Sequence, residues 1–242
     1  MTALAWRDIT LDRRQFNSLC TGLVAGAAGL HLGASAGTVS ASGPYPTSQL
    51  VYEDDTPVTL ASLEAGKSHI FSYPYVTTPC FLVRLKRSSP ARGSWPGGLD
   101  LDQSVVAFSA ICSHKMSHPA KPISHISYRE KVVTFYDASG TKHSRDDVIS
   151  CCSERSVYDP ASAGDVLAGP APVPLAAIAL RNDEDGNLYA TGSFGDDQYD
   201  KFLDKFGFRL AMEYGVSDIR ARTGERCKVV SAAAFSAHQV LC

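Results

Sequence analysis

Apolar runs in this chain are short, and their shortness limits the folds that the chain can adopt. Segments of a few β-branched and aromatic residues alternate with stretches rich in glycine, proline, serine and aspartate. The chain contains 19 glycines and 13 prolines, and both residue types destabilise the interior of a helix. A strand, in contrast, needs only about four to eight residues of this kind. The sequence therefore predicts a mainly β protein with long connecting loops.

Candidate strands can be placed on the chain by their composition. Six segments are rich in strand-forming residues, and they are 58–60, 69–73, 80–86, 104–111, 131–136 and 148–149. Residues 175–181 and 187–193 are expected to form a hairpin around the Asp-Glu-Asp-Gly turn at 183–186. Helical spacing is found at 199–206, and residues 213–242 give no clear signal.

The charge of the chain argues against one class of partner. Its formal net charge is −2, whereas a nucleic-acid-binding domain carries a basic patch or stripe. A hydrophobic fraction of 44% and a charged fraction of 20% are typical of globular proteins. We therefore expect a globular domain that does not bind nucleic acid.

The N-terminal segment has the features of an export signal. Arg13 and Arg14 precede Gln15-Phe16 and a weakly apolar stretch from Leu19 to Ala36, an order that resembles a twin-arginine signal. The stretch ends in Ala-Ser-Ala, which is a possible cleavage site. Its length is also near the minimum of about 17 residues for a membrane span. The segment is therefore either a cleaved signal or a retained membrane anchor helix, and either one predicts a protein on the periplasmic face of the cytoplasmic membrane.

Four regions follow from these observations. Residues 1–36 form the signal or anchor, and residues 37–50 are small and polar, which is typical of a linker. The folded domain is expected at 51–195. Residues 196–242 form a C-terminal extension.

Seven cysteines cannot all pair within one chain. Cys151 and Cys152 are adjacent, and we do not expect them to pair with each other because a bond between neighbouring residues is strained. Some of the thiols should therefore be free or bound to a metal. The seven are Cys20, Cys80, Cys112, Cys151, Cys152, Cys227 and Cys242.

Two cysteine segments have the residue types of a metal site. The first is Cys112-Ser113-His114, in which a thiolate and an imidazole stand two positions apart. The second begins at Cys151 and continues to Ser156-Val157-Tyr158-Asp159. Each follows an apolar, β-rich run, so each is expected on a loop at the end of a strand. Thiolates and imidazoles from two such loops can together hold a metal ion or an iron–sulfur cluster.

The order of these motifs resembles the Rieske family of iron–sulfur proteins. After the second segment come Gly169-Pro170-Ala171-Pro172, similar to the loop that covers the cluster in that family. The resemblance extends over residues 100–195. The Ser-x-Tyr pair is most similar to the iron–sulfur subunit of quinol-oxidising cytochrome complexes.

This resemblance implies a Rieske-type β-sandwich with a [2Fe–2S] cluster bound by two loops at one tip. It makes Cys112 and Cys151 the two thiolate ligands and His114 the first imidazole ligand. Ser156 and Tyr158 occupy the positions whose hydroxyl groups donate to the cluster sulfurs. Gly169 and Pro170 belong to the covering loop.

The sequence departs from the family pattern at the fourth ligand. Glu154 stands where the second histidine is expected, and a carboxylate is a harder, anionic ligand. In the alternative register Cys152 is the thiolate, and the matching position is then Arg155, which cannot bind a metal. Three other histidines are possible substitutes: His118, His125 and His143.

A second departure concerns the disulfide that joins the two loops in the family. The matching positions are Ser117 and Ser153. Because both cysteines are replaced together, neither leaves a stray thiol. The two loops are therefore expected to be less constrained than in most members.

Three functions are compatible with this pattern. The first is single-electron transfer in a membrane-bound respiratory complex with a quinol or cytochrome partner, by an electron-transfer subunit rather than an independent enzyme. The second is a cluster-free structural or docking subunit of a redox complex, which Glu154 favours. The third is the small subunit of another oxidoreductase, such as a molybdenum enzyme.

Overall fold

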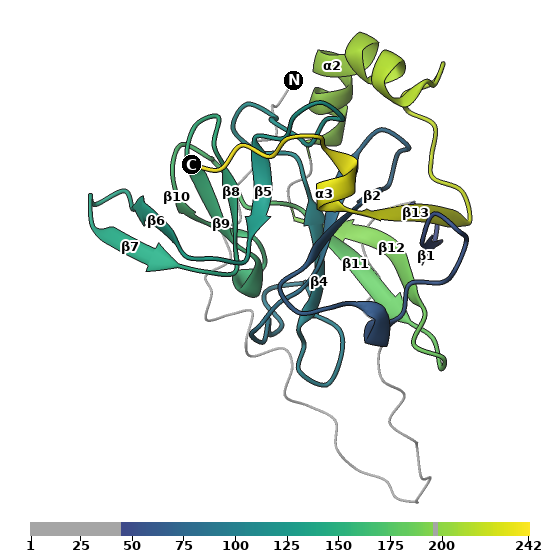
Figure 1. The fold of residues 1–242 in the computed structure, drawn as a ribbon, viewed down its shortest axis with the longest axis horizontal. Coiled ribbons are helices and arrows are strands. Elements are labelled where there is room, and N and C mark those ends of the chain that lie inside the picture. Colours follow the sequence, from purple (N-terminus) through teal and green to yellow (C-terminus); the bar gives the residue numbers. More distant parts are fainter. Residues whose placement is uncertain (1–44, 196–197) are drawn as a thin grey trace, which may run out of the picture. The chain divides into compact units, whose positions relative to one another are not determined.

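Seven strands close into a barrel in the computed structural model, which describes residues 45–195 and 198–242 (Figure 1). The predicted signal at 1–36 and most of the predicted linker lie outside the described residues. The strand order is β1-β12-β11-β4-β3-β2-β13. The barrel strands are β1 (Ser48–Val51), β2 (Ser68–Ser72), β3 (Pro79–Arg84), β4 (Val105–Ser109), β11 (Ala177–Asn182), β12 (Leu188–Phe194) and β13 (Arg226–Ser231).

The central strands are apolar on both faces because both faces are buried. Along β3, Leu82 faces one hydrophobic cluster together with Leu50 and Val229, while Phe81 and Val83 face another. Side chains alternate between the two faces of a strand, so a strand covered on both sides must be continuously apolar. The second cluster packs the barrel against a separate sheet.

That separate sheet carries the second cysteine segment. Its strand order is β10-β9-β8-β5, and a two-stranded hairpin of β6 and β7 extends beside it (Figure 1). Cys151 ends β8 and pairs with Ser156 at the start of β9. The bounds are β5 (Ile126–Arg129), β6 (Val133–Tyr136), β7 (Lys142–Arg145), β8 (Val148–Cys151), β9 (Ser156–Asp159) and β10 (Asp165–Ala168).

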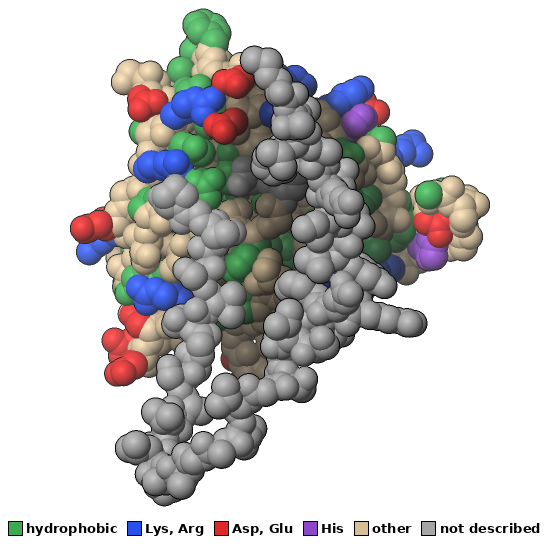
Figure 2. Space-filling model, turned by 180° about the vertical axis from the view of Figure 1, so that it is seen from behind, with side chains coloured by type: hydrophobic (Ala, Val, Ile, Leu, Met, Phe, Trp, Pro, Cys, Tyr) green, Lys and Arg blue, Asp and Glu red, His purple; other side chains and the backbone are tan. Residues whose placement is uncertain are grey.

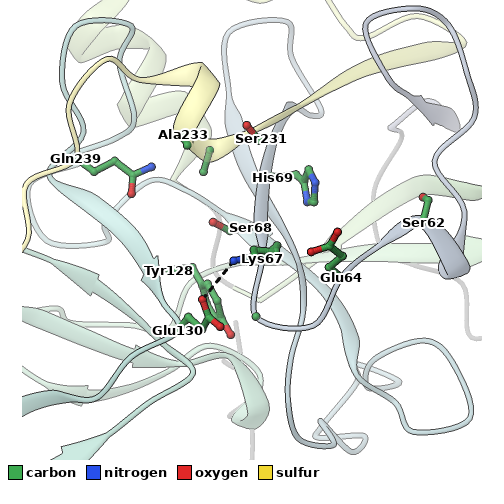
Figure 3. A pocket seen from close by; sticks show the side chains of 12 residues that line it. Ser62, Glu64, Lys67, Ser68, His69, Tyr128, Glu130, Ser231, Ala233 and Gln239 are labelled. Atoms are coloured by element: carbon green, nitrogen blue, oxygen red, sulfur yellow. Dashed lines mark ion pairs between the residues drawn. The ribbon is translucent and has the colours of Figure 1, made fainter.

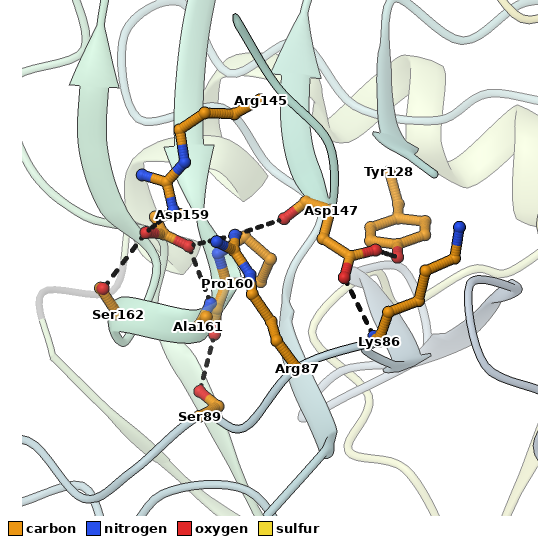
Figure 4. Close-up of polar contacts among 10 residues, drawn as sticks. All are labelled: Lys86, Arg87, Ser89, Tyr128, Arg145, Asp147, Asp159, Pro160, Ala161 and Ser162. Carbon is orange, nitrogen blue, oxygen red and sulfur yellow. Dashed lines mark hydrogen bonds and ion pairs between the residues drawn. The ribbon is translucent and has the colours of Figure 1, made fainter. Parts of the chain in front are cut away.

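Polar contacts join the segment after β3 to this sheet (Figure 4). The Asp159 carboxylate lies between two guanidinium groups, with Arg87 at 2.8 Å and Arg145 at 2.9 Å. It also accepts a hydrogen bond of 3.0 Å from the Ala161 amide. Asp147 accepts from the Tyr128 hydroxyl and from the Lys86 amide. These contacts fix the end of β9, directly after Tyr158.

Helices are few among the described residues. They are η1 (Leu60–Ser62), η2 (Pro160–Ser162), α2 (Tyr199–Tyr214) and α3 (Ala232–Phe235). The helix α2 buries Phe202, Leu203 and Leu210 and ends at Gly215, which has a φ of 64°. Glycine adopts this left-handed conformation without strain. Within residues 45–195 and 198–242, none of the helices has both the length and the apolar character needed to cross a membrane.

Charged side chains of both signs are interspersed where the described residues are visible in Figure 2. Many form ion pairs across short distances. Arg220, for example, binds Asp200 at 2.6 Å and Asp204 at 2.7 Å, both on α2. The pairing agrees with the small net charge of −2.

The prediction of a mainly β fold with the cysteine loops at one tip is confirmed. The predicted strand at 58–60 is wrong, because the Thr59 side chain accepts a hydrogen bond from the Ser62 amide and caps η1. The strand β1 begins at Ser48, inside the predicted linker. The strand β13, from the predicted C-terminal extension, completes the barrel.

Candidate functional site

The first cysteine loop, residues 112–118, is a tight turn after β4. The Met116 amide donates to the Cys112 carbonyl at 2.9 Å, and the Cys112 amide donates to the Ser117 carbonyl at 2.9 Å. Met116 has a φ of 63°, which lets the chain reverse within these few residues. The turn places the Cys112 sulfur against Tyr158 of the second sheet.

The second cysteine loop, residues 151–156, connects β8 and β9 and meets the first loop at Cys151. The Cys112 and Cys151 thiols are both buried and are hydrogen-bonded to each other. This bond lowers the pKa of Cys112 and raises the pKa of Cys151. Negative charge is therefore favoured on the Cys112 sulfur.

Donors surround both sulfur atoms. The backbone amides of His114 and Lys115 donate to the Cys112 sulfur. The Ser153 amide acts in the same way on Cys151. Hydrogen bonds to a sulfur stabilise its anionic form, so these donors favour a thiolate at Cys112, whereas Cys151 stays protonated because it donates to Cys112.

The hydroxyl group of Tyr158 lies 3.2 Å from the Cys112 sulfur and accepts a hydrogen bond of 3.1 Å from the Ser113 amide. Tyr158 is completely buried, and this burial, together with the nearby Cys112, raises its pKa. Tyr158 therefore stays a neutral donor. The Ser156 hydroxyl is also buried and has no hydrogen-bond partner among the described residues.

His114 is half-buried. Its Nδ1 atom is buried without a hydrogen-bond partner among the described residues. A buried nitrogen that lacks a partner costs free energy unless another group satisfies it. The position next to Cys112 therefore suits a nitrogen that binds a metal.

Glu154, the predicted fourth ligand, forms an ion pair with Lys115 of the first loop. The hydrogen bond from Lys115 lowers the pKa of Glu154. Beside this pair, the Ser117 hydroxyl donates to the Ser153 hydroxyl at 2.9 Å. Polar contacts thus connect the two loops at the place where the resemblance implies a disulfide.

The three other candidate histidines have different surroundings. His118 is buried, donates from Nδ1 to the Met116 carbonyl at 2.9 Å, and packs edge-on against two phenylalanines of α2. His125 shares a recess with His118. His143 pairs with Asp137 at 2.8 Å in the β6–β7 hairpin. None of these contacts involves either thiol.

The segment after β10 contacts both loops. Gly169 has a φ of 84°, and a Cβ atom there would lie only 2.5 Å from the Arg155 carbonyl oxygen. Only glycine therefore permits this close approach to the second loop. The Ser113 hydroxyl donates to the Val173 carbonyl at 2.7 Å, which ties the first loop to the same segment. Pro170, between these two contacts, is exposed.

A disulfide between Cys152 and Cys242 was not predicted from the sequence. The two residues are 90 positions apart, and the odd number of cysteines gave no way to choose a pairing. The four other cysteines in the described part of the chain are free and buried: Cys80, Cys112, Cys151 and Cys227.

A separate pocket of about 460 Å³ lies away from these residues (Figure 3). Glu130, which is paired with Lys67 at 3.7 Å, lines it together with Glu64 and His69. No residue of either cysteine loop lines this pocket. It is therefore not part of the predicted site.

Three of the four positions named from the resemblance, Cys112, Cys151 and His114, have the donor types of an iron–sulfur cluster. The two thiols are in contact, and the His114 Nδ1 atom and the Ser156 hydroxyl are buried without partners among the described residues. The fourth position is Glu154, whose carboxylate is paired with Lys115. Within the described ranges, no group of three or more His, Cys, Asp or Glu side chains is already arranged to hold a metal ion. Binding would therefore require a rearrangement of side chains.

No family model matches the chain. Among solved structures, it is similar to the soluble domain of the Rieske protein II (soxF) from Sulfolobus acidocaldarius, with 22% identity and a TM-score of 0.43 over 64% of this chain and 81% of that one. It is also similar to the ferredoxin of carbazole 1,9a-dioxygenase from Nocardioides aromaticivorans IC177, with 17% identity and a TM-score of 0.32 over 56% of this chain and 94% of that one. These similarities are weak, so the functional proposal depends on the contacts of the site itself.

Proposed function

We propose that this chain is a Rieske-type iron–sulfur protein that transfers single electrons. The observation that supports this most is the contact between the Cys112 and Cys151 thiols, each of which accepts from a backbone amide. Cys112, His114 and Cys151 would hold the cluster, with Glu154 as a weaker fourth ligand. When bound, a [2Fe–2S] cluster of this kind takes up and releases one electron.

The surrounding residues would set the affinity of the site for that electron. Tyr158 places a neutral hydroxyl group 3.2 Å from the Cys112 sulfur, and the buried Ser156 hydroxyl has no partner among the described residues. Such donors stabilise added negative charge and so raise the reduction potential. Glu154 acts in the opposite direction because its carboxylate adds negative charge. We therefore propose a potential in the lower part of the Rieske range, which begins at about −150 mV.

One observation favours a second function, that of a cluster-free structural or docking subunit. Glu154 is held by Lys115 in an ion pair, and Ser117 and Ser153 join the loops by a hydrogen bond. These contacts stabilise the two loops without a metal. A protein that no longer bound the cluster would keep the fold through them.

Metal analysis of protein purified without oxygen separates the two functions. We expect about two irons and two sulfides per chain, with an electron paramagnetic resonance signal after reduction. A Cys112→Ser/Cys151→Ser double variant is the control and should contain no iron. Wild-type protein without iron or sulfide under these conditions would establish the cluster-free function instead.

We further propose that the protein works on the periplasmic face of the cytoplasmic membrane, between a quinol or cytochrome partner and a membrane-bound redox complex. The support is the order of Arg13-Arg14 and the apolar stretch that follows. Export by the twin-arginine route suits a cofactor that is inserted before transport. The membrane contact would be made by residues 1–36 if they are not removed.

Replacing Arg13 and Arg14 by lysine is expected to keep the protein in the cytoplasm, because the arginine pair is the part of the signal that is recognised. Cell fractionation and immunoblotting measure the distribution. Arg7→Lys is the matched control and should leave export unchanged. Normal export of the Arg13→Lys/Arg14→Lys protein would contradict the signal.

A further inference from the structure

The last seven residues form a strap that lies along the segment before β5. This C-terminal strap, residues 236–242, runs from α3 past β5, the edge strand of the second sheet (Figure 1). The Ser124 amide donates to the His238 carbonyl, and the Val240 amide donates to the Ser124 carbonyl, each at 2.8 Å. A further bond of 2.8 Å connects the Ala237 amide to the Lys121 carbonyl. The strap thus pairs with the chain that links the first cysteine loop to β5.

The strap ends in a covalent bond to the second cysteine loop. Cys242 is joined to Cys152, and their Cα atoms are 5.6 Å apart. Cys152 directly follows Cys151, and its amide donates to the His125 carbonyl at 2.6 Å. The disulfide therefore acts on the backbone one residue away from a thiol of the proposed site.

The side-chain pairs that join the second loop to the first are exposed. The side chains of Lys115 and Glu154 are 60% and 35% exposed, and the Ser117–Ser153 hydrogen bond is also exposed. Exposed polar pairs contribute little to stability because water competes for both partners. Within the described residues, Cys152–Cys242 is the one covalent link between the second loop and another part of the chain.

We propose that the Cys152–Cys242 disulfide is a reducible clasp that keeps the second cysteine loop in place for cluster binding. Its role in regulating the site rests on the proposed function. Cys242 is exposed and Cys152 is half-buried, so a small reductant can reach the disulfide. When the clasp opens, the strap is released and the backbone around Cys151 loses its covalent restraint.

A dithiol reductant opens the clasp by thiol–disulfide exchange. One thiolate of the reductant attacks the Cys242 sulfur, and Cys152 leaves as a thiolate that takes up a proton. The second thiol of the reductant then displaces Cys242 and gives up its own proton. Two electrons pass to the protein, which gains two thiols, while the reductant becomes a cyclic disulfide.

Amide hydrogen exchange of the full-length chain tests the clasp. We expect dithiothreitol to speed exchange of the Cys152 and Val240 amides by about tenfold or more, while the β3 and β4 amides stay unchanged. A Cys152→Ser/Cys242→Ser double variant should exchange rapidly with and without dithiothreitol. Unchanged protection of residues 152–156 in the reduced wild-type protein would overturn the proposal.

Iron release to a chelator, measured on the same samples, separates this proposal from the proposed function. We expect release about tenfold faster from reduced wild-type protein and no effect of dithiothreitol on the double variant. If neither protein contains iron but exchange responds to reduction, the clasp stands and the electron-transfer function fails. If iron is present and neither its release nor exchange responds, the function stands and the clasp is refuted.

Discussion

Glu154→His is expected to slow the loss of iron from the site by about tenfold or more. The imidazole replaces a carboxylate that Lys115 holds in the wild-type protein, and it completes a set with Cys112, His114 and Cys151. It also removes one negative charge, so the reduction potential should rise. Iron release to a chelator and a spectroscopic redox titration measure these two effects.

Glu154→Gln is the matched control for this prediction. It removes the charge and the ion pair with Lys115 but supplies only a weak amide ligand. If the slower loss of iron depends on the imidazole ligand and not on the loss of charge, Glu154→Gln should bind iron no better than the wild-type protein. Equal iron retention by the glutamine and histidine variants would show that release of Lys115, rather than the imidazole, is responsible.

Asp159→Ala is expected to lower the free energy of unfolding by about 3 kcal/mol. The Asp159 side chain is only 5% exposed and lies between Arg87 and Arg145. Its removal leaves two guanidinium groups without their partner. Both are about one third exposed and regain some hydration, so the loss should fall at the lower end of the range for buried pairs. Urea unfolding at neutral pH measures it.

Asp165→Ala provides the comparison for Asp159. Asp165 pairs with Arg92 at 2.6 Å, and the arginine side chain is 57% exposed. Loss of this pair should cost less than about 1 kcal/mol because it is mostly hydrated. Equal destabilisation by the two substitutions would contradict the role assigned to burial at Asp159.

Local composition was sufficient to predict most of the central strands. The segments that became β3 and β4 are apolar because the barrel core and the second sheet cover both of their faces. The order of the motifs was sufficient to predict that Cys112 and Cys151 lie on neighbouring loops, because each motif follows its own strand.

Contacts between distant parts of the chain could not be predicted in this way. The strand β13 has an alternating pattern that is too short to stand out, and its partner β1 lies in a segment of linker-like composition. The Cys152–Cys242 bond joins residues with no shared motif. The pairing of Glu154 with Lys115 depends on how the two loops face each other, which spacing along the chain does not determine.

The pairing of β1 with β13, which closes the barrel, determines when the barrel can form during synthesis. Residues 49–51 of β1 pair in parallel with residues 226–228 of β13, and β13 also pairs with β2. The barrel cannot close before residues 226–231 have emerged from the ribosome. Until then the outer edges of β1 and β2 expose unpaired amide and carbonyl groups, which are templates for aggregation. A nascent chain of this protein therefore keeps both edges open until β13 has emerged.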